Sequence, residues 1–540
     1  MKSIYKLSFL LSLICMLSGC DSFLKEDPRS SATPDLIFQS ESGVVAALRN
    51  CYTIFTASKF DVDGGVTAAG ITPAANRAFF LLSEVPGDDC WIRNTNNNPR
   101  VTLDTYQFDA DNENIATMYF SLFLGIKNVN HFIANVQKSG VGSEEFRNEA
   151  IAEAKAIRAY LYFVYVRLFG EGPLLNESLD STDLNNLERT DIASIYEQII
   201  SDLEAALILE NKHIEGAGRM SKAAVKSILA EVYLTMAGHV YNKISSKISL
   251  SKKDMYTRSA EYALDVWQNM GFSLYPSYEE LFTVKGNNSS ESILEAVSEQ
   301  NRYPQEAVPD VQNSYDLGVD KDGNQTFKGM FWHKDPETGK DVYLTKTLGR
   351  YTLSPVLLGE FQQNTEDKRM NTLVKAYNNS FGNRNLEVYG TSKYADVTVF
   401  ERNLSDSFES RAHYKILRLA SVMLIYAEAS NEAEGKPNAN AIAAINEIRE
   451  RAGIFNSEIP DTYEAFKNAV YMERRKELYF EGYRWFDLVR TEQLEQKVKE
   501  SKSGVNYTVT PLVSFKHYLF PIPNVAFRLN PELGKQNEGW

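Results

Sequence analysis

The sequence feature that most constrains the fold is a set of long segments in which apolar residues recur every three or four positions. Such a period places the apolar side chains on one face of an α-helix. The period is clearest at Ile115, Met118, Tyr119, Leu122, Phe123, Ile126 and Val129, and again at Ile151, Ala154, Ile157, Leu161, Tyr165 and Leu168. Further helices are predicted at 191–210, 221–240, 254–270, about 411–433, 439–452 and 461–490. The chain is therefore predicted to be mainly α-helical.

Several residues mark where these helices begin and end. Gly271 and Gly453 each follow a periodic segment, in the position where glycine commonly closes a helix. Gly170 stops the second of the two long helices. The residues Asp461-Thr462-Tyr463-Glu464 have the pattern of a capping box, with Asp461 as the N-cap of the last helix.

An internal similarity favours helices that pack as pairs. Residues 229–237 read LAEVYLTMA and residues 419–427 read LASVMLIYA, so leucine, alanine and valine recur at matching positions. Small alanines between large aliphatic side chains suit the close packing of antiparallel helix pairs of the tetratricopeptide type. We therefore expect an α-solenoid-like body, with irregular rather than tandem spacing of its repeats.

Two regions lack the helical period and are rich in glycine, proline, asparagine and tyrosine, at about 58–110 and 272–410. They are predicted to form loops and short strands carried on the helical frame. The frame comprises about 34–57, 111–271 and 411–490, and 34–540 as a whole is predicted to be one domain. Because loops on a rigid scaffold commonly carry binding residues, we expect the ligand face in these two regions.

The N-terminus has the features of a bacterial signal peptide. Two lysines precede an apolar run from Leu7 to Leu17, which is too short to span a bilayer. The run ends in Leu17-Ser18-Gly19-Cys20, which is similar to a lipobox, where the cysteine is acylated and becomes the first residue of the mature protein. We predict a signal peptide at 1–19, lipidation of Cys20 and a tether at 20–33. An ordinary secretory signal with a chance cysteine is the alternative.

The composition argues against two classes of protein. Hydrophobic residues make up 43% and charged residues 24% of the 540 residues, which is enough apolar surface for a sizeable core and argues against wholesale disorder. The formal net charge of −14 would repel a phosphate backbone, so nucleic acid is not expected as a partner. Beyond Cys20 the cysteines are Cys51 and Cys90, and the sequence leaves open whether they form a disulfide.

The sequence holds no recognised catalytic motif. The six histidines stand apart, without the patterns that place a base beside a metal or a nucleophile. Asp88-Asp89 could supply a glycosidase acid or base, but a solvated pair in a loop is the favoured interpretation. Two segments, Asp109-x-Asp111-x-Glu113 and Asp320-x-Asp322-x-Asn324, begin like calcium loops but lack the glycine and glutamate that complete them. No cofactor is predicted, with calcium kept as the alternative.

The segment ERRKELYFEGYRWFDLVRT at 473–491 interleaves arginines with aromatic residues, a composition also found in surfaces that bind nucleic acid. Acidic residues alternate with the arginines, so ion pairs three or four residues apart account for the charges. We therefore interpret the aromatic residues as core, and we expect Arg484 or Arg490 to hold neighbouring segments in place.

Several blocks, in order along the chain, carry a family resemblance. They are the lipobox, EAKAIRAYLYFVYVRLFGEGPLL at 153–175, AAVKSILAEVYLTMAG at 223–238, YAEASNEAEG at 426–435, INEIRERAGI at 445–454, the block at 473–491, and YLFPIPNVAFRLNPELGKQNEGW at 518–540. Together they resemble the SusD/RagB family of outer-membrane glycan-binding lipoproteins.

The resemblance implies a mostly helical fold with tetratricopeptide-like helix pairs and a loop face that binds glycans. It also implies a partner, a SusC-like TonB-dependent transporter, which such a protein covers like a lid and to which it passes oligosaccharide. It further implies that the protein is not an enzyme. The acidic pair Glu26-Asp27 after Cys20 resembles a surface-export signal, so we expect a lipid-anchored protein exposed on the cell outer membrane.

Glycan binding requires flat aromatic side chains for the apolar faces of sugar rings, beside groups that hydrogen-bond hydroxyls. Trp91 lies in the polar loop GDDCWIRNTNNN, and Trp332 lies in KGMFWHKD. The residues predicted to bind glycan are Trp91, Arg93, Asp89, Tyr303, Asn313, Tyr315 and Trp332. For the tryptophans the alternative is a structural role, packed against the helical frame.

The predicted function is therefore capture of an oligosaccharide or polysaccharide and its delivery to the transporter, without catalysis. A lipoprotein scaffold that only assembles proteins, a lid for peptide uptake and a secreted glycosidase are the alternatives. The sequence leaves open which glycan or peptide is bound and which residues contact the transporter.

Overall fold

The computed structural model describes residues 34–56, 60–62, 66–68, 71, 77–92, 99–177, 186–213, 215–297, 332–334, 341–343, 351–378, 386–391, 393–394, 412–455, 458–502 and 511–540. The predicted signal peptide, lipidation site and tether lie outside these residues. The division of 34–540 into frame and loop regions as one domain stays a prediction, although the helices described below fall largely within the predicted frame.

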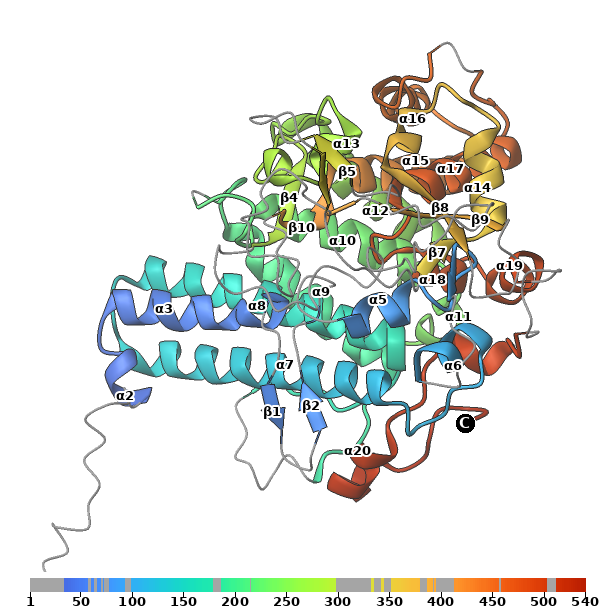
Figure 1. The fold of residues 1–540 in the computed structure, drawn as a ribbon. Coiled ribbons are helices and arrows are strands. Elements are labelled where there is room, and N and C mark those ends of the chain that lie inside the picture. Colours follow the sequence, from blue (N-terminus) through green and yellow to red (C-terminus); the bar gives the residue numbers. More distant parts are fainter. Residues whose placement is uncertain are drawn as a thin grey trace, which may run out of the picture.

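The N-terminal part is built on three helices, α3, α7 and α8, that lie side by side (Figure 1). Its elements are α2 (Pro34–Ile37), α3 (Glu41–Cys51), α4 (Thr53–Thr56), β1 (Phe60–Val62), β2 (Val66–Ala68), α5 (Arg77–Ser83), β3 (Cys90–Ile92), α6 (Pro99–Thr105), α7 (Glu113–Ser139) and α8 (Glu144–Phe169). Gly140 adopts a left-handed conformation, with φ of 62°, and ends α7. The Ser143 side chain then accepts a hydrogen bond from the Phe146 amide and begins α8. The two longest helices are therefore joined by a short, well-capped turn.

A second group of helices follows and continues into the C-terminal half. Its elements are α9 (Ile192–Ala205), η2 (Ala206–Ile208), α10 (Lys222–Met236), α11 (Tyr241–Ile244) and α12 (Lys252–Asn269). Gly271 follows α12 with φ of 70°, as predicted for a glycine that closes a helix. α12 packs against both α10 and α15 (Leu419–Glu434). The two helices with similar sequences, α10 and α15, thus belong to one packed layer.

The strands form two-stranded antiparallel ribbons among the described residues, with the pairs β1–β2, β3–β7, β4–β10, β5–β6 and β8–β9. The elements between the helical groups are α13 (Tyr278–Leu281), η3 (Val284–Gly286), β4 (Ser292–Ala296), β5 (Trp332–Lys334), β6 (Asp341–Tyr343), β7 (Tyr351–Leu353), α14 (Pro355–Gln362), η4 (Lys368–Thr372), β8 (Leu373–Asn378), β9 (Leu386–Thr391) and β10 (Tyr414–Arg418). This middle region is therefore made of short strands, as the loss of helical period predicted, and of short helices, which it did not predict.

The C-terminal part contains α15, α16 (Ala439–Arg451), α17 (Tyr463–Leu478), α18 (Arg484–Arg490), α19 (Leu494–Ser501), η5 (Phe515–Tyr518), α20 (Asn524–Leu529) and η6 (Pro531–Leu533). Two sequence predictions are wrong here. The helix predicted at about 411–433 begins as strand β10, because Tyr414–Arg418 pairs with β4 and only then continues into α15. The helix predicted at 461–490 is two helices, α17 and α18, and its N-cap is Thr462 rather than Asp461, without a side-chain capping bond.

The break between α17 and α18 has a clear structural cause. Phe480 and Gly482 adopt positive φ angles of 59° and 87°, which no helix can continue through. The amides of Gly482 and Tyr483 donate to the buried Glu84 carboxylate instead of to helical carbonyl groups. A side chain from the N-terminal part of the chain therefore ends the helix.

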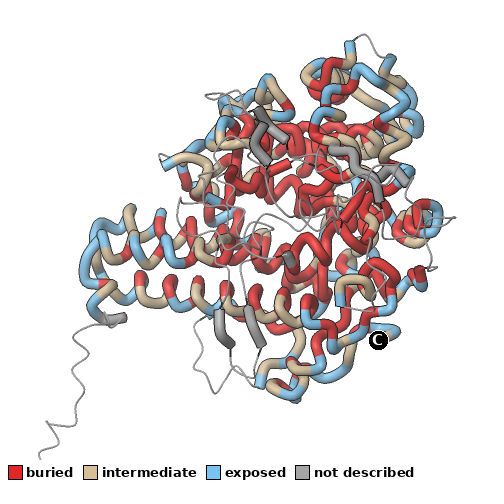
Figure 2. Tube along the Cα trace, in the orientation of Figure 1, coloured by how far each residue is buried: buried red, intermediate tan, exposed pale blue. Residues whose placement is uncertain are grey.

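The core lies where the helical groups meet (Figure 2). α8 crosses it: from Ala152 to Phe169 every residue is buried except Lys155 and Arg167, which are partly exposed. Alanines in this segment let neighbouring helices approach closely, while its aromatic residues fill the space between them. The mainly α-helical fold with tetratricopeptide-like pairs is thus confirmed.

Two further observations concern the chain as a whole. Within the described ranges, no helix combines the length and the apolar composition that crossing a bilayer requires. Cys51 and Cys90 are both buried free thiols, so the disulfide that the sequence left open does not form here. Burial, and then the nearby Glu153 carboxylate, raises the pKa of Cys51 to about 12.

Candidate functional site

Trp91 lies in the short ribbon formed by β3 and β7, where it stands opposite Thr352. Successive side chains of a strand point to opposite faces. Cys90 and Ile92 on either side of Trp91 are buried, whereas Trp91 itself is partly exposed. Of the predicted binding residues, Trp91 is thus placed by the structure at the boundary between core and surface.

The loop before Trp91 is held by a buried ion cluster, which we define as Asp88, Asp89, Arg475 and Arg484. Arg484 donates to Asp88 through Nε at 2.6 Å and Nη2 at 2.9 Å. Arg475 donates through Nε to Asp89 Oδ1 at 2.6 Å. Both carboxylates are buried, so the expectation of a solvated pair in a loop is wrong. The reason is that two arginines from the C-terminal helices reach them and replace water.

This cluster changes the role that Asp89 can have. Its carboxylate is fully buried and is engaged by two guanidinium groups, so it is not presented to a ligand as a hydrogen-bonding group. Burial alone would raise the pKa of Asp88, but Arg484 and Arg475 hold it well below its usual range. Asp89 therefore positions the strand that carries Trp91, instead of the predicted contact with sugar.

Glu84 lies beneath the same loop. Its Oε1 accepts hydrogen bonds from the amides of Gly482 at 2.6 Å and Tyr483 at 3.1 Å. Burial, and then the charge of Asp89, raises the pKa of Glu84 to about 8. The start of β3 and the break between α17 and α18 are thus fixed to each other by charged groups and backbone amides.

The remaining predicted residues are placed only in part. Trp332 lies in β5, opposite Tyr343 of β6, but its side chain is not among the described ones. Arg93, Tyr303, Asn313, Tyr315 and Cys20 lie outside the described residues, and so does the segment Asp320–Asn324. In the other calcium-like segment, Asp109 Oδ1 accepts a hydrogen bond from the Asp111 amide and so shapes the turn before α7. Calcium binding stays untested.

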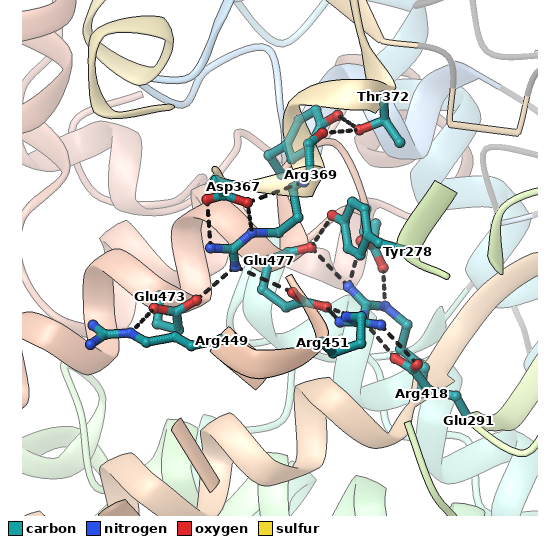
Figure 3. A network of polar contacts seen from close by, with 12 residues as sticks. Tyr278, Glu291, Asp367, Arg369, Thr372, Arg418, Arg449, Arg451, Glu473 and Glu477 are labelled. Carbon is teal, nitrogen blue, oxygen red and sulfur yellow. Dashed lines mark hydrogen bonds and ion pairs between the residues drawn. The ribbon is translucent and has the colours of Figure 1, made fainter. Parts of the chain in front are cut away.

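A larger set of buried charges, which we call the buried charge network, connects the middle region to the C-terminal helices, and Figure 3 shows part of it. Its carboxylates are Glu291, Asp367, Glu473, Glu477 and Glu481, and its cations are Arg369, Lys393, Arg418, Arg449 and Arg451. The formal charges of the two sets cancel. They come from η4 and the residue before it, the segment before β4, the segment after β9, the end of β10, α16, α17 and the turn after it, so the network ties the middle region to the C-terminal helices.

Arg418 is the centre of this network. It donates to Glu481 at 2.7 Å, to Glu291 at 2.8 Å and to Glu477 at 2.6 Å. Its neighbour in the network, Lys393, is buried, which lowers its pKa to about 8 despite the attraction of Glu481. Because these groups are closed off from solvent and matched in charge, they form a structural frame rather than a reactive site.

The network also corrects the interpretation of the block at 473–491. Glu473, Glu477 and Glu481 pair with Arg369, Arg418, Lys393 and the arginines of α16, so pairs three or four residues apart do not account for these charges. The expectation for Arg484 and Arg490 is confirmed, since Arg484 holds the loop before β3 and Arg490 pairs with Glu428 of α15. The sequence signal for the network was Arg418 at the end of the largely apolar segment YKILR at 414–418.

The model of the SusD family matches residues 240–540, which is more than half of the chain. The chain belongs to the SusD family. A second family model, described as starch-binding and associating with the outer membrane, matches residues 64–234.

Individual SusD family proteins match over nearly the full length. SusD-like protein P25 of Formosa agariphila is 26% identical over 550 residues, which cover 96% of this chain and 96% of that protein. A SusD homolog from Bacteroides thetaiotaomicron has a TM-score of 0.73 at 20% identity, covering 95% of this chain and 100% of that one. A laminarin-binding SusD-like protein has a TM-score of 0.66 at 20% identity, covering 93% and 100%. The two structures show that the fold is shared.

Proposed function

We propose that this SusD family protein captures oligosaccharide or polysaccharide at the cell surface through aromatic side chains that include Trp91. The observation that carries the proposal is the placement of Trp91, partly exposed on a ribbon that buried ion pairs hold rigid. A rigid aromatic ring offers apolar area to a sugar ring at little conformational cost. Family membership and the fold shared with a laminarin-binding protein support the same conclusion.

The mechanism is binding and transfer rather than catalysis. The carboxylates that precede Trp91 in the chain, Asp88 and Asp89, are buried and ion-paired, which suits a positioning role and not that of a glycosidase acid and base. The partner is a SusC-like TonB-dependent transporter in the outer membrane, which receives the captured glycan. Lipid on Cys20 holds the protein at that membrane with its ligand face outward. No resident cofactor is part of this mechanism.

Calorimetry of the chain from Ser22 onward tests glycan capture, with a panel of plant, microbial and host polysaccharides. The variants are Trp91→Ala and Trp332→Ala, and Trp91→Phe keeps an aromatic ring at the same place. Phe455→Ala is the matched control, because Phe455 is 62% exposed on another part of the surface. We expect Trp91→Ala to weaken binding at least about tenfold, as loss of a central aromatic contact does, while Phe455→Ala binds like the wild type.

The alternatives give different results in the same experiment. A protein-assembly scaffold would bind no glycan but would still co-purify with the transporter. A peptide-uptake lid would bind peptides instead, and a glycosidase would release reducing ends from its ligand. Binding that is equal in wild type and both alanine variants, with the fold intact, would remove Trp91 and Trp332 from the site.

A further inference from the structure

A hollow of about 190 Å³ opens between α17, α18 and α19, and Trp91 is not among its lining residues. Its lining is strongly basic: Arg474, Arg475, Arg484, Arg490 and Lys497 contribute five cations, and Asp487 is the one carboxylate among the lining residues. The rim carries neutral polar groups, among them those of Asn468 and Gln493. The hollow is therefore a place where positive charge gathers on a protein of net charge −14.

Most of these cations are held from behind. Asp88 and Asp89 pair with Arg475 and Arg484, and Glu428 pairs with Arg490 at 2.8 Å, yet none of these three carboxylates lines the hollow. These arginines are thus balanced mainly by carboxylates outside the hollow, although Asp487, which lines it, also pairs with Arg490 at 2.9 Å. The near side faces the hollow with positive charge that is fixed in place, which costs a bound anion little reorganisation.

Arg474 has donors that the protein does not use. It is 3% exposed and donates through Nε to Asp487 Oδ2 at 2.7 Å, while its plane lies over the ring of Tyr483. Nη1 is buried without a hydrogen-bond partner within the part of the chain that the structure describes. A buried guanidinium with unused N–H groups is costly unless something else accepts from them.

We propose that this hollow binds a small oxyanion, a carboxylate or a sulfate group, either free or carried on an acidic sugar. A guanidinium matches two oxygens of such a group in one plane, and charge-assisted bonds of this kind are the stronger class of hydrogen bond. Its size admits one such group, and Asn468 and Gln493 at the rim can bond a hydroxyl beside it. The inference does not depend on the proposed glycan site at Trp91.

Calorimetric titration of the full chain with sodium sulfate and with sodium glucuronate tests this inference, with ionic strength held constant by sodium chloride. Glucose, which carries no charge, is the control ligand for glucuronate. We expect saturable binding of the anions at one site and none of glucose there. Arg474→Gln should weaken the binding at least about tenfold, since it removes a charged donor.

A second variant covers the case in which Arg474→Gln does not fold. Asn468→Asp places a negative charge at the rim, where Asn468 is exposed, and is expected to weaken anion binding about tenfold by repulsion. Asn440→Asp makes the same change on the exposed surface of α16, outside the hollow, and is the matched control. The affinity of Asn440→Asp for the anions should equal that of the wild type.

The outcomes separate clearly. Saturation by both anions, lost in Asn468→Asp and kept in Asn440→Asp, supports an oxyanion site, and saturation by glucuronate alone supports it as a site for acidic sugar. Sulfate also stabilises proteins without binding, by exclusion from their surface. A sulfate effect that does not saturate, or one that is equal in the two aspartate variants, overturns the inference whether or not Trp91 binds glycan.

Discussion

Glu84 carries a carboxylate into the protein interior directly after α5. Its Oε1 accepts from two backbone amides, those of Gly482 and Tyr483, and Oε2 is buried without a hydrogen-bond partner among the described residues. A carboxylate in this setting is stabilised when it holds a proton, because the neutral form loses less solvation on burial. The protonated form also has an O–H group in place of a second negative oxygen near Asp89.

This setting predicts how stability depends on pH. Glu84 has an ordinary pKa of 4.5 that is raised to about 8 in the folded protein. The folded state therefore keeps a proton that the unfolded chain loses, so the stabilising contribution is complete below pH 4.5 and is lost as pH rises through 8. At 1.36 kcal/mol per pKa unit the loss is about 5 kcal/mol. Denaturant unfolding at pH 5 and pH 9 covers about 4 kcal/mol of that loss.

Glu84→Gln should flatten this pH dependence, because the amide does not titrate. Glu532→Gln is the control, since Glu532 is exposed and its removal should leave the slope unchanged. An equal slope in wild type and Glu84→Gln would mean that Glu84 is ionised in the folded protein at pH 5.

The sequence could not have predicted what holds the loop before Trp91. Asp88-Asp89 follows proline and glycine, so its local pattern indicates a solvated loop. Asp89 pairs with Arg475, which is 386 residues further along the chain. A local sequence pattern cannot predict a contact between residues so far apart. The aromatic character of the site was predictable from Trp91, but the ion pairs that position it were not.

The bounds of whole helices and strands also depend on contacts between residues far apart in the sequence, as the break between α17 and α18 shows. Helices such as α12 and α16 were predicted close to their observed bounds, because their periodicity and end residues are local. The split at 479–483 depends instead on Glu84, 398 residues away from Gly482. The strand β10 was missed for a similar reason, since its partner β4 lies in the middle region.

Substitution of Gly482 tests whether the fold requires this break between α17 and α18. Its φ is 87°, and an added Cβ would lie 2.4 Å from Cε1 of Phe79. Gly482→Ala should therefore lower the free energy of unfolding by about 1–3 kcal/mol, from the strained backbone and the clash together. Thermal or denaturant unfolding provides the measurement.

Gly359→Ala is the matched substitution within a helix. Gly359 lies in α14, and an added Cβ there would meet nothing within 4 Å. Alanine is the better helix former by about 1 kcal/mol, so this variant should be as stable as the wild type or more so. If both alanine variants had the same stability, the conformation at Gly482 would not be required for the fold.

Across the whole molecule, the buried charge network connects parts of the chain that hydrophobic patterning treats separately. It joins the strands and short helices of the middle region to α16 and α17. Ion pairs of this kind add little net stability over an apolar core, but they are specific, because each charge needs its own partner at a fixed place. We infer that the network sets how the middle region sits on the helical frame.

Arg418 is the residue whose loss tests this inference at the scale of the molecule. Arg418→Met fills a similar volume but leaves Glu291, Glu477 and Glu481 without their shared partner in a dry interior. The free energy of unfolding should fall by about 3–5 kcal/mol, as it does when one member of a buried pair is removed. The Arg418→Met/Glu477→Gln double variant should recover part of that loss, because it removes one of the stranded charges.

Arg49→Met is the control for the loss of an arginine ion pair as such. Arg49 pairs with Glu215 at 2.8 Å, but their side chains are 59% and 42% exposed, so the change should cost no more than about 1 kcal/mol. Amide hydrogen exchange shows which segments each variant destabilises. Arg418→Met should speed exchange in both β4 and α17, whereas Arg49→Met should leave exchange in both segments unchanged. Faster exchange in β4 alone would mean that α17 is held by its apolar contacts and that the network does not join the two regions.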